Sequence, residues 1–206
     1  MTDRSSPAAL WADTLEALAN HVAHDFRNAL NGVAVNLEVV RARSARGADS
    51  AAIAPFAATA AAQFEVATAG AEALLGFARP EPAPADVAAV VVRVSRLAGL
   101  RGEGRVRVTD ESDGRARTSA PVELVRAAVA RSVLAALADG DGISCEIAVD
   151  DRIFLRVTGV SPSPPLPDSE LVAIALAHGV HIDACGQSLE LHFPSADPHA
   201  ISKVSS

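Results

Sequence analysis

The sequence has few aromatic residues and almost no lysine. Its 206 residues include no tyrosine, one tryptophan and one methionine, and Lys203 is its only lysine. Nearly all of its 18 basic residues are therefore arginine, so scattered arginines do not by themselves indicate phosphate recognition. The net charge is -7 and no basic block occurs. This composition argues against nucleic acid as a ligand.

Long apolar runs and cysteine frameworks are also missing. No apolar run approaches the ~18 residues that a membrane span needs, and the first residues lead into no signal-peptide core. We therefore expect a cytoplasmic protein that does not associate with membranes. The two cysteines, Cys145 and Cys185, are too few for a disulfide framework. We expect both to be small buried hydrophobic residues in a reducing compartment.

The first third of the chain predicts two long amphipathic helices. One begins near Pro7 and fades over residues 43–50, and a second follows with Pro55 in its first turn, where proline is tolerated. A short connection makes them antiparallel neighbours. Two such helices cannot close a core alone, so we expect a homodimer that forms a four-helix bundle. The apolar positions are spaced by three, four or seven residues: Leu15, Leu18, Val22, Phe26, Leu30, Val33, Leu37 and Val40, then Ile53, Phe56, Ala60, Phe64, Ala67, Leu74 and Phe77.

The rest of the chain mixes helices and strands, which makes the fold class α+β. Residues 80–84, Pro-Glu-Pro-Ala-Pro, predict a stiff and extended linker. The domains expected are a helical hairpin over residues 7–79, an α/β sandwich over residues 85–194, and a loose tail over residues 195–206. Apolar periodicity predicts helices over 87–100, 122–137 and 171–177, and strands over 105–109, 143–149, 153–157, 180–182 and 189–193.

One stretch, residues 20–31, carries the most distinctive chemistry. Helical rotation places His24 about 160° from Val22 and from Phe26, away from the apolar stripe. A neutral imidazole is a nucleophile near pH 7. Asp25 can accept a hydrogen bond from one ring nitrogen and leave the other free to attack phosphorus. An inert surface histidine is the alternative. The other residues on this polar side are Asn20, Arg27, Asn28 and Asn31.

The eight residues from His24 to Asn31, His-Asp-Phe-Arg-Asn-Ala-Leu-Asn, resemble the H-box of sensor histidine kinases. The departure is Ala29, where that family usually has proline, so this helix should run straighter. The resemblance implies that His24 is the phosphoacceptor and that Arg27 balances phosphate charge. It implies that Asn28 and Asn31 position the phosphoryl group or a water molecule.

The order of elements after the linker resembles the ATP-binding domain of the same family, in a degenerate form. Residues 124–137 resemble the N-box helix, but Arg131 and Ala135 replace the asparagines that hold magnesium and phosphate. Residues 158–165 lack the Asp-x-Gly-x-Gly motif that reads adenine, and the lid region is rich in proline over residues 161–167. Phosphoryl transfer from ATP needs the metal and this cradle. We therefore expect no use of ATP.

The resemblance as a whole implies a histidine phosphotransferase of a two-component phosphorelay. His24 would shuttle a phosphoryl group between aspartates of response-regulator receiver domains, which would supply magnesium. The chain itself would need no cofactor and no metal. One alternative is an inactive pseudokinase that acts as a dimeric scaffold, and another is an active sensor kinase. A metal site built on His21 and His24, or on His178 and His181, lacks converging ligands.

Overall fold

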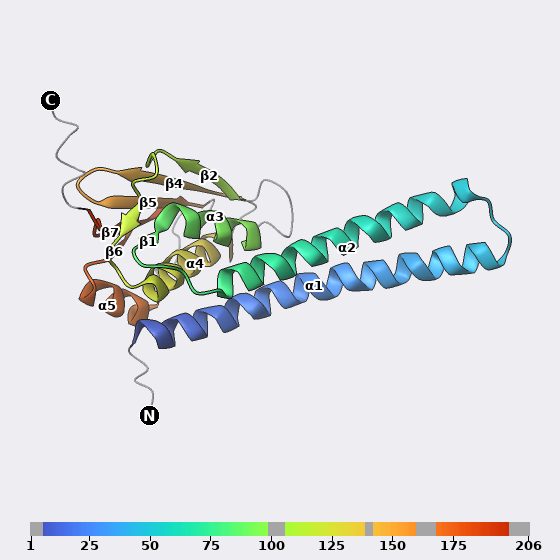
Figure 1. Ribbon diagram of the computed structural model, residues 1–206, viewed down its shortest axis with the longest axis horizontal. Helices are drawn as coiled ribbons and strands as arrows, with labels where there is room; N and C mark the ends of the chain where they lie inside the picture. The colour runs from blue at the N-terminus through green and yellow to red at the C-terminus, as the bar shows by residue number, and fades with distance from the viewer. Residues whose placement is uncertain (1–5, 99–105, 139–141, 160–167, 198–206) are drawn as a thin grey trace. The chain divides into compact units, whose positions relative to one another are not determined.

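The computed structural model describes residues 6–98, 106–138, 142–159 and 168–197. Its fold is α+β, as the sequence predicts: a long helical hairpin precedes a mixed sheet with helices (Figure 1). The chain divides into two compact units, one from Ala19 to Phe77 and the other comprising Met1–Leu18 with Ala78–Ser206. None of the helices in the described ranges has the length and apolar character that a membrane crossing requires.

The hairpin unit is built from two helices, α1 (Pro7–Ala45) and α2 (Ser50–Ala78). Gly47 follows α1 with a φ of 73°, a left-handed conformation that ends helices and that glycine adopts without strain. The Asp49 carboxylate accepts a hydrogen bond from the amide of Ala52 at 2.8 Å and caps the start of α2. The predicted pair of long helices with a short connection is confirmed.

The position predicted for Pro55 within α2 is wrong. The Asp49 cap starts the helix at Ser50, so Pro55 lies inside α2 rather than in its first turn. A proline there cannot donate the usual hydrogen bond to the carbonyl four residues earlier. Pro55 is exposed, so water can reach the carbonyl that lacks its usual donor.

The second unit is an α/β sandwich around one five-stranded sheet. Its strand order is β2-β4-β5-β7-β6, with β2 parallel to β4 and the other neighbours antiparallel. The long elements match the sequence prediction to within a few residues, although residues 99–105 lie outside the described ranges. The elements are β1 (Ala85–Asp86), α3 (Val87–Ala98), β2 (Val106–Asp110), β3 (Arg117–Thr118), α4 (Val122–Ala138), β4 (Ile143–Val149), β5 (Ile153–Thr158), α5 (Ser169–Ala177), β6 (His181–Cys185) and β7 (Ser188–Phe193).

The core of this unit lies between the sheet and the helices α3, α4 and α5. Burial alternates strictly along β5 and β7, so one face of the sheet is packed and the other is partly open to solvent. In Figure 1, α3, α4 and α5 all lie on the same side of the sheet. The packed face carries apolar side chains that are fully buried, among them Ile147, Leu155, Val157, Leu189 and Leu191.

Three features near the domain boundaries were not predicted. Strands β1 and β3 form a small antiparallel ladder, in which Ala85 lies opposite Thr118. The segment predicted as a stiff linker, residues 80–84, is anchored at Glu81, which forms ion pairs with Arg93 of α3 and Arg126 of α4. Beyond β7, Ser195 bridges to Thr118, so ordered pairing continues into the segment predicted as a tail.

Candidate functional site

The candidate site is His24, on the part of α1 that belongs to the hairpin unit. The side chain of His24 is 63% exposed, which confirms that the imidazole faces solvent as the helical rotation predicts. The helix continues without a break through Ala29. The ring therefore stands on a regular helix and is accessible to a partner molecule.

Two neighbours in sequence contact the same ring nitrogen. Nδ1 of His24 lies 3.3 Å from Oδ1 of Asp25 and 3.2 Å from Nδ2 of Asn28. Asn28 is one helical turn further along, so its side chain reaches back over the ring. Nδ1 is thus held by the protein, and Nε2 has neither of these contacts. This leaves Nε2 as the nitrogen available for chemistry. The Asp25 side chain is only 14% exposed, so its carboxylate is partly shielded from water.

The other two residues of the predicted site, Arg27 and Asn31, do not contact the ring. Arg27 and Asn31 are exposed. Among the described residues, no hydrogen bond or ion pair joins either of them to His24. The structure therefore brings Asp25 and Asn28 to the imidazole and leaves Arg27 and Asn31 pointing to solvent.

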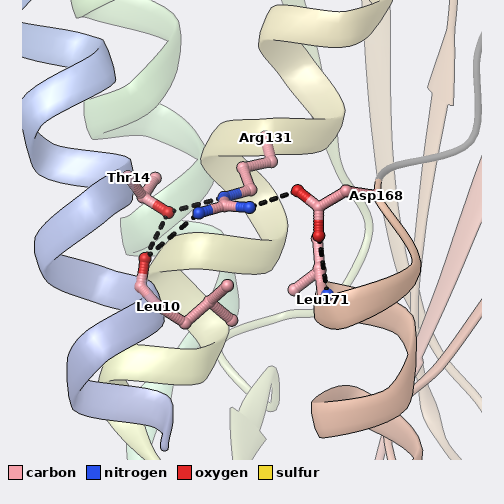
Figure 2. A network of polar contacts seen from close by, with 5 residues as sticks. All are labelled: Leu10, Thr14, Arg131, Asp168 and Leu171. Atoms are coloured by element: carbon pink, nitrogen blue, oxygen red, sulfur yellow. Dashed lines mark hydrogen bonds and ion pairs between the residues drawn. The ribbon is translucent and has the colours of Figure 1, made fainter. Parts of the chain in front are cut away.

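The side chain of Arg131, which replaces an expected asparagine, forms polar contacts with residues of α1 and with the N-terminal cap of α5 (Figure 2). Its guanidinium forms an ion pair with Asp168, donates to Oγ1 of Thr14 at 2.8 Å and lies 3.5 Å from the carbonyl oxygen of Leu10. Asp168 also caps α5 by accepting from the amide of Leu171 at 2.8 Å. These contacts tie α4 to α5 and to the first turns of α1, and sequence reasoning did not find them.

The structure describes some of the other positions at which the sequence departs from an ATP-binding motif. Gly159, just after β5, is buried close to α4, and a Cβ there would lie 3.2 Å from the carbonyl oxygen of Ala136. Ala135 is half-buried on α4. The proline-rich segment over residues 161–167 lies outside the described residues.

The prediction for the cysteines holds for one and is wrong for the other. Cys145 is buried in β4, and burial raises the pKa of its thiol to about 12. Cys185 is exposed, because it ends β6 at the edge of the sheet. The nearby Glu190 carboxylate is the main cause that raises the pKa of the Cys185 thiol.

The histidine pairs show no convergence on a metal. His178 is the C-terminal cap of α5, and His181 begins the edge strand β6. In the parts of the chain that the structure describes, no three His, Cys, Asp or Glu side chains are grouped so that they could hold a metal ion.

Comparison with solved structures gives several distant matches. The blue-light activated histidine kinase of Erythrobacter litoralis EL346 is 12% identical with a TM-score of 0.37, and the match covers 87% of this chain but only 60% of the kinase. A bacterial phosphotransferase is 17% identical with a TM-score of 0.39, over 86% of this chain and 94% of its own. The Acinetobacter baumannii histidine kinase AdeS is 12% identical with a TM-score of 0.41, over 84% and 98%.

No family model and no curated protein matches the sequence. At identities of 12–17% and TM-scores of 0.37–0.41, the matches describe a distant likeness. No activity and no residue role is transferred from them to this chain.

Proposed function

We propose that this chain is a cytoplasmic histidine phosphotransferase that carries a phosphoryl group on His24 between receiver-domain aspartates, without using ATP. The observation that carries the proposal is an exposed imidazole whose Nδ1 lies within hydrogen-bond distance of Asp25 and Asn28, while Nε2 has neither contact. A ring held by one nitrogen presents the other in a fixed direction, which is the arrangement a nucleophile needs.

The transfer step uses Nε2 of His24 and an aspartyl phosphate of the receiver. The Nε2 lone pair forms a bond to phosphorus as the bond between phosphorus and the aspartyl oxygen breaks, and the aspartate leaves with that electron pair. The ring becomes an imidazolium with its proton on Nδ1, and the Asp25 carboxylate stabilises that charge. Transfer to a second receiver reverses these bond changes.

The independence from ATP rests on Arg131. The N-box that residues 124–137 resemble carries a metal-binding asparagine at this position of α4. Here the guanidinium is paired with Asp168 and hydrogen-bonded to Thr14. It is a cation, which cannot ligate magnesium. We therefore propose that the phosphoryl group comes from a receiver domain and not from ATP.

We further propose that the hairpin forms a homodimer through one apolar face. Leu30 and Leu37 of α1, and Phe64 and Leu75 of α2, are large apolar residues that are 40–62% exposed. Each lies about 90° from the buried centre of its helix, in the same rotational sense. In an antiparallel pair this puts all four on one side of the hairpin. His24 lies toward the other side, so a second copy on this face would leave the imidazole accessible.

The dimer is tested by Leu37→Glu, with Glu38→Gln as a matched control on the exposed face of the same helix. Sedimentation equilibrium should show a dimer for the natural chain and for the control. The Leu37→Glu chain should be a monomer, because a buried charge opposes association. A natural chain that is monomeric at all concentrations would contradict the dimer.

The receiver would approach the opposite side of the hairpin, which carries His24 and one exposed apolar side chain, Val66. Gln63 of α2 lies against Gly32 of α1, which puts Val66 close to level with Asn28. Val66 is 45% exposed and lies on the same side of the hairpin as Asn28. Val66→Asp should slow transfer from a receiver, yet leave phosphorylation by the small donor phosphoramidate unchanged. Equal rates of transfer from the receiver would refute this docking surface.

The function is tested by incubating the chain with a panel of receiver domains that carry radioactive aspartyl phosphate. We expect acid-labile label on the chain, lost in His24→Ala and kept in His21→Ala, which removes a histidine one turn earlier. Incubation with radioactive ATP and magnesium should give no label.

The competing function is a dimeric scaffold without phosphoryl chemistry. The apolar face of the hairpin favours it equally, because dimerisation does not use His24. A natural chain that no receiver labels, but that remains a dimer, would support the scaffold and refute phosphotransfer. Label from ATP would instead indicate an active kinase.

A further inference from the structure

We infer that Asn28 competes with Asp25 for Nδ1 of His24, and so holds part of the population in a ring form that cannot accept phosphate. This inference rests on the proposed function for its consequence, but its physical basis is the geometry of one nitrogen. Asn28 would then be a positioning residue that limits the reactivity of His24.

One nitrogen cannot satisfy both neighbours at once. Nδ1 lies 3.3 Å from a carboxylate oxygen of Asp25, which only accepts hydrogen bonds, and 3.2 Å from the amide nitrogen of Asn28, which only donates. If Nδ1 carries hydrogen, it donates to Asp25 and confronts the Asn28 amide with a second donor. If Nδ1 carries a lone pair, it accepts from Asn28 and faces the Asp25 carboxylate with a second acceptor.

The two arrangements give the ring opposite reactivity. In the neutral ring, hydrogen on Nδ1 leaves the lone pair on Nε2, the nitrogen that would attack phosphorus. A lone pair on Nδ1 puts the hydrogen on Nε2, and no bond to phosphorus can form there until that proton leaves. Asp25 therefore favours the reactive tautomer and Asn28 favours the unreactive one.

The balance between the two is set by hydrogen-bond strength. A hydrogen bond to a charged carboxylate is stronger than one between neutral groups, so the reactive tautomer should predominate. A neutral hydrogen bond shifts such an equilibrium by roughly two- to tenfold. Asn28 should therefore reduce the reactive fraction without abolishing it.

The direct test is the tautomer of His24, measured by long-range nitrogen–proton NMR on histidine-labelled protein at a pH of about 8, where an ordinary imidazole is neutral. The signals are assigned with His24→Ala. Asn28→Ala should raise the ratio of the Nδ1-protonated to the Nε2-protonated form by roughly two- to tenfold. Asp25→Asn should lower it. Glu38→Gln, at an exposed position almost four turns away on the same helix, should leave it unchanged.

A second readout connects the tautomer to chemistry. Phosphorylation by phosphoramidate, which needs no docking surface, should be faster in Asn28→Ala than in the natural chain, but by less than twofold, because the reactive tautomer already predominates. An unchanged Nδ1-protonated fraction in Asn28→Ala would overturn the inference, because Asn28 would then have no influence on the tautomer. A lower fraction would overturn it as well, because the Asn28 side chain would then present its oxygen, and not its nitrogen, to the hydrogen on Nδ1. The NMR measurement involves no phosphate, so it remains decisive even if no receiver labels the chain.

Discussion

Replacing Arg131 with methionine should lower the free energy of unfolding of the α/β unit by about 2 kcal/mol. The hydrogen bond to Thr14 Oγ1 is 2.8 Å long and its acceptor is fully buried, so its loss should cost about 1.5 kcal/mol. The ion pair joins Arg131 and Asp168 side chains that are 20% and 49% exposed, and solvent screening limits it to about 0.5 kcal/mol. Methionine keeps an apolar stem of similar length, so packing should change little.

Substitutions of Asp168 separate its two contacts. Asn caps a helix about as well as Asp, so Asp168→Asn should lose only the ion pair, at about 0.5 kcal/mol. Asp168→Ala also removes the bond to the Leu171 amide and should cost about 1 kcal/mol more. The pair Arg131→Met and Asp168→Asn should be less than additive, since both remove the same ion pair.

Trp11 makes the assay specific to this part of the molecule. It is the only tryptophan, it lies in the first turns of α1, and its ring centroid is 5.2 Å from the guanidinium carbon of Arg126. Its fluorescence during urea denaturation therefore reports on the segment that Arg131 holds. Arg107→Met, on the edge strand β2, is the control for loss of an exposed arginine. An unchanged urea midpoint in Arg131→Met, or equal losses in Asp168→Asn and Asp168→Ala, would refute the reasoning.

Two further predictions concern other parts of the chain. A thiol reagent should modify Cys185 but not the buried Cys145 in the native protein; Glu190→Gln should speed that reaction near neutral pH, because the carboxylate raises the pKa of Cys185 and its removal increases the thiolate fraction. A Cβ on Gly32 would lie 1.9 Å from Oε1 of Gln63, so Gly32→Ala should stabilise the hairpin by about 1 kcal/mol in a Gln63→Ala background and by less in the natural chain. Equal thermal shifts in the two backgrounds would contradict that contact.

The local part of the site could be predicted from sequence because helices are local structures. The apolar stripe fixes which side of α1 is buried, and this alone places His24 in solvent. Asp25 and Asn28 are one and four residues away, so helical geometry brings both to the ring. The strands of the sheet could also be predicted from the sequence, because buried and partly exposed positions alternate along the whole length of β5 and β7.

Features that depend on pairing between distant parts of the chain could not be predicted from the sequence. Strands β1 and β3 have two residues each, too few to carry a period. The partners of Arg131 lie 37 and 117 residues away in sequence, so the replaced asparagine was visible but its new role was not. The exposure of Cys185 could not be predicted, because the strand order that puts β6 at the edge of the sheet is set by the tertiary fold.

The most direct test of the account is the phosphorus NMR spectrum of the chain after it is mixed with a phosphorylated receiver domain in the absence of nucleotide. We expect the resonance of a phosphoimidazole substituted at Nε2, present in the natural chain and missing in His24→Ala. Phosphorus found on another residue, or found on His24 only when ATP is supplied, would contradict the claim that this histidine is an acceptor that works without a nucleotide site.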